Sequence, residues 1–170
     1  IQAGIDAASN GDTVLVAAGT YVENIDYNSK QLVVASHFLG SDGDDDVISN
    51  TIIDGDSIAS CVTMNGNESE LIGFTLTNGL STSEGNGSAV TISAASELSY
   101  CLLINNYGNA AIIIGNSYSS SFDHLTIYDN YGYDGWDNAI IGYGCCSESD
   151  ELNFSNSIFS FFEYYGGYSP

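Results

Sequence analysis

The chain has 170 residues, 44% of them hydrophobic, and this length and composition favour one folded domain over a disordered segment. It contains 22 acidic residues but a single lysine and no arginine, which gives a formal net charge of −21. Such a charge argues against nucleic-acid binding, and it repels anionic membranes and anionic polysaccharides unless cations bridge. No run approaches the roughly 20 apolar residues of a membrane span, so membrane insertion is not expected. We interpret the charge as an adaptation for solubility in a salty medium, with specific cation binding as the alternative.

The first 24 residues predict a short helix followed by two strands. Apolar residues recur at helical spacing within residues 1–10, and Asn10-Gly11 supplies a stop signal. A Gly-Asp turn then leads into an apolar strand at residues 13–17, and a second strand at residues 20–24 follows a break. Two short strands with a tight corner between them indicate one coil of a winding structure. We expect the helix to lie over the end of that first coil.

Further short strands are predicted at residues 31–36, 51–55 and 60–64, each closed by a polar turn. The segment between the first two, LGSDGDDDVISN at residues 39–50, is rich in glycine and aspartate. This composition predicts a protruding loop.

The second half of the chain repeats itself. Four segments share one apolar pattern: LIGFTLTNG from Leu71, LSYCLLINN from Leu98, FDHLTIYDN from Phe122 and a looser copy, NFSNSIFSF, from Asn153. The matched positions are Leu76, Leu103, Ile127 and Ile158, about 25 to 30 residues apart. Two copies precede another apolar strand, at residues 89–92 and 110–114, and the linkers are too short for crossover helices. Short strands also suit an antiparallel sandwich, but coils that stack on copies of themselves explain why the sequence repeats.

Three motifs carry a family resemblance: IQAGIDAASNGDTVLVAAGTYVENI at residues 1–25, TIIDG at residues 51–55 and GFTLTNG at residues 73–79. With them the chain resembles the secreted bacterial right-handed parallel β-helix proteins of the broad pectin-lyase-like group. The resemblance implies an all-β fold, a single-stranded right-handed parallel β-helix (solenoid) with a short N-terminal capping α-helix. Residues 1–170 would form one domain, with the cap at 1–10 and about six to seven coils in 12–170. The chain is then expected to be a segment of a larger protein, secreted or at the cell surface.

Side-chain alternation along each strand predicts which residues point inward. The expected inward pairs are Phe74 and Leu76, Cys101 and Leu103, and Leu125 and Ile127. Asn106 and Asn130 then lie at equivalent corners, where their amides can stack as a ladder. The outward column contains Thr77, Ile104, Tyr128 and Phe159, and it becomes apolar toward the C-terminus. It is either covered by a loop such as residues 131–136 or forms a contact surface for sugar or protein.

Several groups have the chemistry of catalytic residues, and each has a structural interpretation. The GTYVE corner at residues 19–23 resembles a pectin methylesterase signature, but that family uses an arginine, so Tyr21 and Glu23 are expected to pack and hydrogen-bond the turn. Lys30 is the only candidate base for a lyase and lies in a polar turn. Asp54 and Asp56 resemble a hydrolase carboxylate pair, but TIIDG is typical of a turn.

The Asp123-His124 dipeptide suggests part of a Ser-His-Asp triad. Neighbouring residues on a strand point to opposite faces, however, so Asp123 is not expected to orient the His124 ring. We predict an exposed histidine on an outer strand face.

Acidic residues supply the clearest sign of a ligand. Asp42, Asp44, Asp45 and Asp46 lie in a glycine-containing segment that can converge several oxygens on Ca²⁺, although the pattern of an EF-hand is incomplete. A solvated acidic loop is the competing interpretation. Residues 129–137, DNYGYDGWD, form a weaker candidate for a cation, and the rings there can equally face a sugar.

The four cysteines, Cys61, Cys101, Cys145 and Cys146, lack the paired spacing of a zinc site. One of the adjacent pair can bond to a distant cysteine in an oxidising compartment, or all can be free buried thiols.

The sequence therefore favours a non-enzymatic extracellular scaffold for adhesion or assembly, with a polysaccharide or a cell-surface protein as partner. The first alternative is a carbohydrate-binding module whose exposed aromatic residues are Tyr128, Tyr131, Tyr133 and Trp136. The second is a lyase or hydrolase acting on polysaccharide. The third is a filament subunit that stacks end to end, because the last coil exposes an unpaired edge near the aromatic residues 159–170. No cofactor is expected other than Ca²⁺.

Overall fold

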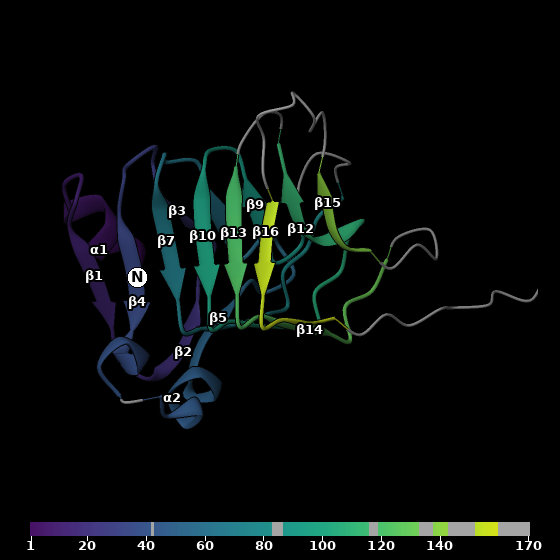
Figure 1. Cartoon of the computed structure of the whole chain (residues 1–170), viewed down its shortest axis with the longest axis horizontal. Coiled ribbons are helices and arrows are strands. Elements are labelled where there is room, and N and C mark those ends of the chain that lie inside the picture. The colour runs from purple at the N-terminus through teal and green to yellow at the C-terminus, as the bar shows by residue number, and fades with distance from the viewer. Residues whose placement is uncertain (42, 83–86, 116–118, 133–137, 143–151, 160–170) are drawn as a thin grey trace, which may run out of the picture.

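The computed structural model describes residues 1–41, 43–82, 87–115, 119–132, 138–142 and 152–159. Its regular structure is mostly β-strand, and the strands form three parallel sheets (Figure 1). Within these residues, no helix is long and apolar enough to cross a membrane.

Each sheet is built from strands of successive coils. The first sheet contains β1 (Thr13–Val16), β4 (Val33–Ser36), β7 (Ser69–Ile72), β10 (Ser96–Ser99), β13 (Ser120–Asp123) and β16 (Leu152–Ser155). The second contains β2 (Gly19–Val22), β5 (Thr51–Asp54), β8 (Thr75–Thr77), β11 (Leu102–Ile104), β14 (Thr126–Tyr128) and β17 (Ile158–Phe159). The third contains β3 (Ile25–Asp26), β6 (Val62–Met64), β9 (Val90–Ile92), β12 (Ala110–Ile114) and β15 (Asn138–Gly142).

Every sheet takes each third strand in chain order, so the chain passes through the three sheets in turn and then begins again. Figure 1 shows the result for the first sheet, in which the strands of successive coils lie side by side. The predicted strands are thus present, and their parallel pairing excludes the antiparallel sandwich for the described residues. The arrangement is compatible with a parallel β-helix.

The repeat alignment is confirmed for three copies and wrong by one residue for the fourth. Leu103 pairs with Leu76 on one side and with Ile127 on the other. In the last coil Phe159, not Ile158, lies opposite Ile127. The looser copy aligns through Phe154, which pairs with Phe122, and counting from that ring would have set the register. Phe159 therefore has the register of Ile127 and not that of Tyr128.

The core lies between the sheets, where the predicted inward residues are found. Their exposed fractions are 2% or less, which confirms the alternation in the three middle coils; they are Phe74, Leu76, Cys101, Leu103, Leu125 and Ile127. The core is one continuous apolar cluster that extends to Ile5 of the N-terminal helix.

The N-terminal helix α1 (Gln2–Ala7) is shorter than the predicted 1–10 and packs Ile5 against the core. It ends at Ala7, before Asn10-Gly11, and Lys30 caps its last turn. The Lys30 ammonium donates to the carbonyl oxygens of Ile5, Asp6 and Ala8 at 2.8, 2.8 and 2.9 Å. A cation that bonds the last carbonyls of a helix satisfies them and complements the helix dipole.

The GTYVE corner has the structural role expected of it. Tyr21 Oη donates to the Ala17 carbonyl at 2.9 Å and thereby spans the corner. Glu23 bonds elsewhere than predicted, because its Oε2 accepts from the Gln2 N–H at the start of α1, at 2.8 Å.

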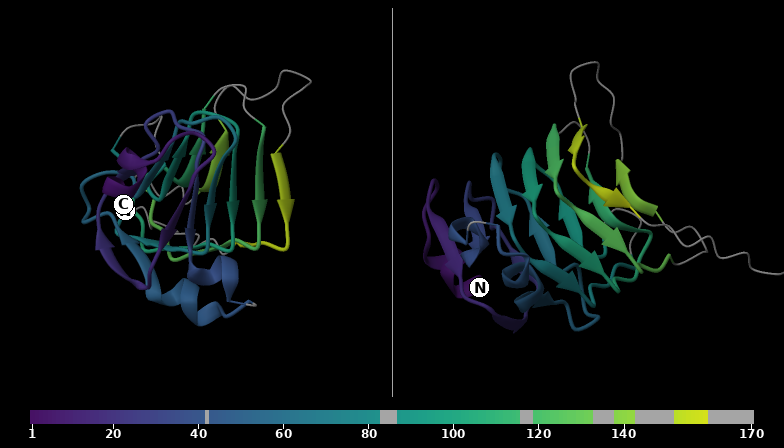
Figure 2. Two further views of the ribbon diagram at one scale, coloured as in Figure 1. Left: turned by 90° about the vertical axis from the view of Figure 1, so that its left-hand side faces the viewer. Right: turned by 60° about the horizontal axis from the view of Figure 1, so that its bottom comes forward.

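The predicted loop at residues 39–50 is mostly helical, which corrects the sequence interpretation. A 3-10 turn, η1 (His37–Gly40), precedes the helix α2 (Asp45–Asn50). The aspartates begin α2: Asp44 accepts from the Asp46 N–H, and two acidic residues in the first turn complement the positive end of the helix. The helix lies against the outer face of the second sheet, where Thr75 Oγ1 donates to the Ile48 carbonyl at 3.0 Å (Figure 2).

Candidate binding groove

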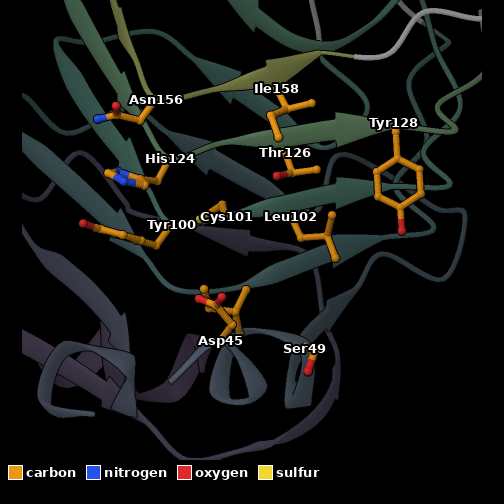
Figure 3. Close-up of a pocket in the computed structure, with 11 residues that line it drawn as sticks. Asp45, Ser49, Tyr100, Cys101, Leu102, His124, Thr126, Tyr128, Asn156 and Ile158 are labelled. Carbon is orange, nitrogen blue, oxygen red and sulfur yellow. The ribbon is translucent and has the colours of Figure 1, made fainter. Parts of the chain in front are cut away.

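A groove of about 500 Å³ runs between α2 and the outer face of the second sheet; we call it the α2 groove. Helix α2 supplies one wall through Asp45, Ile48 and Ser49. The opposite wall comes from three successive coils, and Figure 3 shows its side chains stacked rung upon rung. On the strands these are Leu102, Thr126, Tyr128 and Ile158. The volume is within the range of about 300–1,000 Å³ that is typical of ligand sites.

One end of the groove is formed by Tyr100, His124 and Asn156, which Figure 3 shows one above another. Each occupies the corner between the first and second sheets, with φ angles of 53°, 51° and 49°. The Tyr100 and His124 rings stack, with centroids 4.5 Å apart and planes inclined by 13°. Gly73 has the same left-handed backbone one coil earlier, with a φ of 81°, so this conformation is how successive coils turn between the two sheets.

The same corner corrects the prediction that Asp123 and His124 point apart. His124 follows the last residue of β13, and its left-handed backbone brings its ring to the Asp123 side chain, with Nδ1 and Oδ2 2.8 Å apart. Strand alternation does not apply because His124 is a corner residue. The ring is exposed, as predicted. Among the described residues, no serine, threonine or cysteine side chain hydrogen-bonds to it.

The Asp123 carboxylate is fully engaged by the last described coil. Its Oδ1 accepts from Ser155 Oγ at 2.6 Å and from Asn156 Nδ2 at 3.0 Å. These bonds, that of Ser155 first, and the bond with His124 lower the pKa of Asp123 to about 2. The carboxylate therefore links the His124 corner to the last described coil.

At the other end of the groove's strands, Asn106 and Asn130 form a ladder of side-chain amides. This confirms the prediction that the two residues lie at equivalent corners. The Asn130 Oδ1 accepts from both the backbone N–H and the Nδ2 of Asn106, each at 2.9 Å. The Asn106 Oδ1 accepts from the Gly79 N–H at 2.8 Å, one coil earlier. Each amide thus links its own coil to a neighbour, and β8, β11 and β14 are fixed relative to one another.

The structure separates the predicted ligand-binding aromatic residues. Tyr128 lines the α2 groove. Tyr131 lies outside that lining, past the next corner, where it bridges to Tyr107 and is 54% exposed. Tyr133 and Trp136 are outside the described residues. The predicted outward column is half-buried at Thr77, Ile104 and Tyr128.

The predicted calcium ligands also lie in different surroundings. Asp44 caps α2, Asp45 lines the groove, and Asp46 lines a separate depression on the other side of the helix with Asn50. In the part of the chain that the structure describes, no three histidine, cysteine or acidic side chains converge as metal ligands. Asp42 falls outside that part, so the Ca²⁺ site stays a prediction.

Sequence reasoning missed an acidic pair on the first sheet. Glu70 and Glu97 are directly opposite in β7 and β10. Partial burial, and then the charge of Glu97, raise the pKa of Glu70. The sequence feature that could have indicated this pair is the tripeptide Ser-Glu-Leu, which occurs at both residues 69–71 and residues 96–98.

The other candidate groups have structural partners. Asp54 Oδ1 accepts from the Asp56 N–H at 2.9 Å, as expected of a turn. Cys61 and Cys101 are free, buried thiols, whereas Cys145 and Cys146 lie outside the described residues.

Comparison with known proteins gave no matching family model, no matching curated protein and no matching solved structure. The resemblance to pectin-lyase-like proteins therefore stands on the motif residues, with the three parallel sheets compatible with it.

Proposed function

We propose that this chain is a non-enzymatic, right-handed parallel β-helix of the pectin-lyase-like kind, secreted or at the cell surface, and that it serves adhesion by binding carbohydrate in the α2 groove. The observation that carries the proposal is the composition of that groove. It combines the Tyr128 ring and apolar side chains with hydroxyl and amide groups on stacked strands. Apolar surface with a few oriented polar groups is what small-ligand sites require.

Rigid support makes these strands suitable for binding. The residues between and beneath them, such as Leu103 and Ile127, are fully or almost fully buried, and the asparagine ladder ties the coils together. A ligand would meet side chains already held in place, so it would lose little affinity to ordering them.

Carbohydrate suits the groove better than an extended peptide. The wall opposite α2 is the face of a sheet, and the backbone groups of β11 are paired with β8 and β14. A peptide lying on β11 therefore finds no free strand edge to extend. A ligand must therefore be recognised by side chains. Tyr128 offers a ring for a sugar face, and the hydroxyls of Ser49 and Thr126 and the amide of Asn156 can hydrogen-bond to sugar hydroxyls.

A non-catalytic role is favoured by how the reactive groups are used. Lys30, the chain's only basic residue of the lysine or arginine type, donates all three ammonium hydrogens to α1 carbonyls. The Asp123 carboxylate is engaged by three side chains.

The test is binding of the purified chain to a panel of soluble oligosaccharides, with two matched tyrosine variants. Tyr128→Ala removes a ring from the groove, and Tyr131→Ala removes an exposed ring outside it. We expect the first to weaken binding by about three- to tenfold, the range for loss of a ring contact, and the second to leave it unchanged.

Two outcomes would overturn parts of the proposal. If the wild-type chain binds no oligosaccharide, the carbohydrate function is wrong; if Tyr131→Ala weakens binding and Tyr128→Ala does not, the site is not the groove. Release of uronate from pectin or alginate would contradict the non-enzymatic role.

A further inference from the structure

We infer that the groove's ligand is a cationic saccharide, an oligomer of an amine-bearing sugar such as glucosamine, and that Asp45 is its ionic partner. The inference rests on the proposed carbohydrate function and adds the chemical class of the sugar. It is carried by the charge inventory of the chain, by the position of Asp45, and by Tyr128.

The charge inventory disfavours an anionic sugar. A uronate or sulfate needs a cationic partner. Lys30 is the only lysine of the chain, which has no arginine. Its ammonium lies beneath α1, held by three carbonyl oxygens, and it is not among the residues of the groove. An anionic ligand would therefore meet a net charge of −21 with no lysine or arginine in the groove, whereas an ammonium group would be attracted.

Asp45 is placed to make that attraction specific. It is an exposed residue in the first turn of α2, and Figure 3 shows it across the groove from Tyr100 and Leu102. Within the described residues its carboxylate accepts no hydrogen bond, unlike that of Asp44, which caps the helix. The Asp45 oxygens are consequently available to a ligand.

Tyr128 adds a second preference for a cation. Figure 3 shows its ring at the end of the groove opposite Tyr100, His124 and Asn156. An ammonium group over the face of a tyrosine ring is attracted by the ring quadrupole. A sugar oligomer that carries an amine on each unit can present one amine to Asp45 and another to this ring.

The test compares three oligomers of equal length by isothermal titration calorimetry: glucosamine, N-acetylglucosamine and glucose. All are measured at one pH at which the glucosamine amines are protonated. At low salt we expect the glucosamine oligomer to bind about fivefold or more tighter than the other two, with the difference lost at high salt. Asp45→Asn should weaken its binding by about two- to fivefold and leave the neutral oligomers unaffected.

Asp46→Asn is the matched control, because it removes the same charge from the same helix on the side away from the groove. If both variants weaken glucosamine binding equally, the attraction is a general effect of net charge and the role of Asp45 is refuted. If the three oligomers bind equally well, the carbohydrate function stands and the cationic class is wrong. If none binds, the proposed function fails and this inference fails with it.

Discussion

Replacing Asn106 by alanine should be among the most destabilising single changes in the middle coils. The Asn106 side chain is fully buried. Its Nδ2 donates to the carbonyls of Leu76 and Ile104 and to Asn130, and its Oδ1 accepts from the Gly79 N–H. The substitution removes all of these bonds and leaves their partners in place.

The size of the expected loss of stability depends mainly on the hydrogen-bonding partner of Asn106 that is hardest to supply with another acceptor. That partner is the N–H of Gly79, a buried residue, which donates to the Asn106 Oδ1 and loses this acceptor in the alanine variant. A buried unpaired donor costs about 1–3 kcal/mol, and the lost bonds to the Leu76 and Ile104 carbonyls add about 1 kcal/mol or more. The free energy of unfolding should fall by about 3–4 kcal/mol, a large share of the roughly 5–15 kcal/mol of a typical domain.

The measurement is urea unfolding followed by circular dichroism, with Asn130→Ala as the matched control. Asn130 makes similar bonds, because its Oδ1 accepts from Asn106 and its Nδ2 donates to the carbonyls of Leu103 and Tyr128. It is only half-buried, however, so its loss should cost less, about 1–2 kcal/mol. The double variant should lose less than the sum of the single losses, because both remove the bond between the two amides. An Asn106→Ala variant as stable as Asn130→Ala would show that the ladder does not hold the coils as argued.

Three further predictions concern groups whose surroundings the structure defines. Lys30→Met should lower the free energy of unfolding by about 1–2 kcal/mol and speed amide exchange in α1, because three carbonyls lose their donor; unchanged exchange would contradict the cap. Glu97→Gln should stabilise the protein near neutral pH by about 0.2–1 kcal/mol, because it removes a like charge opposite Glu70. Because the pKa of Glu70 is raised in the folded state, the wild type should gain stability as pH falls through that pKa toward the unfolded value of 4.5. The Glu97→Gln variant should gain less stability over the same pH range. An equal gain in both proteins would argue against the pair. Burial raises the pKa of Cys61 to about 12 and that of Cys101 to about 11. At mildly alkaline pH both thiols should therefore be alkylated far more slowly in native than in unfolded protein, as measured by peptide mapping. Equal rates would disprove their burial.

Much of the fold could be predicted because equivalent residues of successive coils lie directly beside one another. A repeated apolar alternation is then enough to place Leu76, Leu103 and Ile127 in register inside the core. The same reasoning placed Asn106 and Asn130 at one corner, and their mutual hydrogen bonds follow from that position. It failed at Phe159, where the repeat is loosest and an alignment shifted by one residue gave Ile127 the wrong strand partner.

The α2 groove, in contrast, was decided by the tertiary structure. Sequence reasoning placed Asp45 in an acidic loop and Tyr128 on a distant strand, with no pattern to join them. They line one groove because α2 packs on the outer face of the second sheet, and the next coils extend that face past the helix. Likewise, Asp123 and His124 come together only through a left-handed corner that strand periodicity does not describe. Periodic side chains determine a periodic core, whereas an inserted helix and the backbone angles of a corner depend on what they pack against.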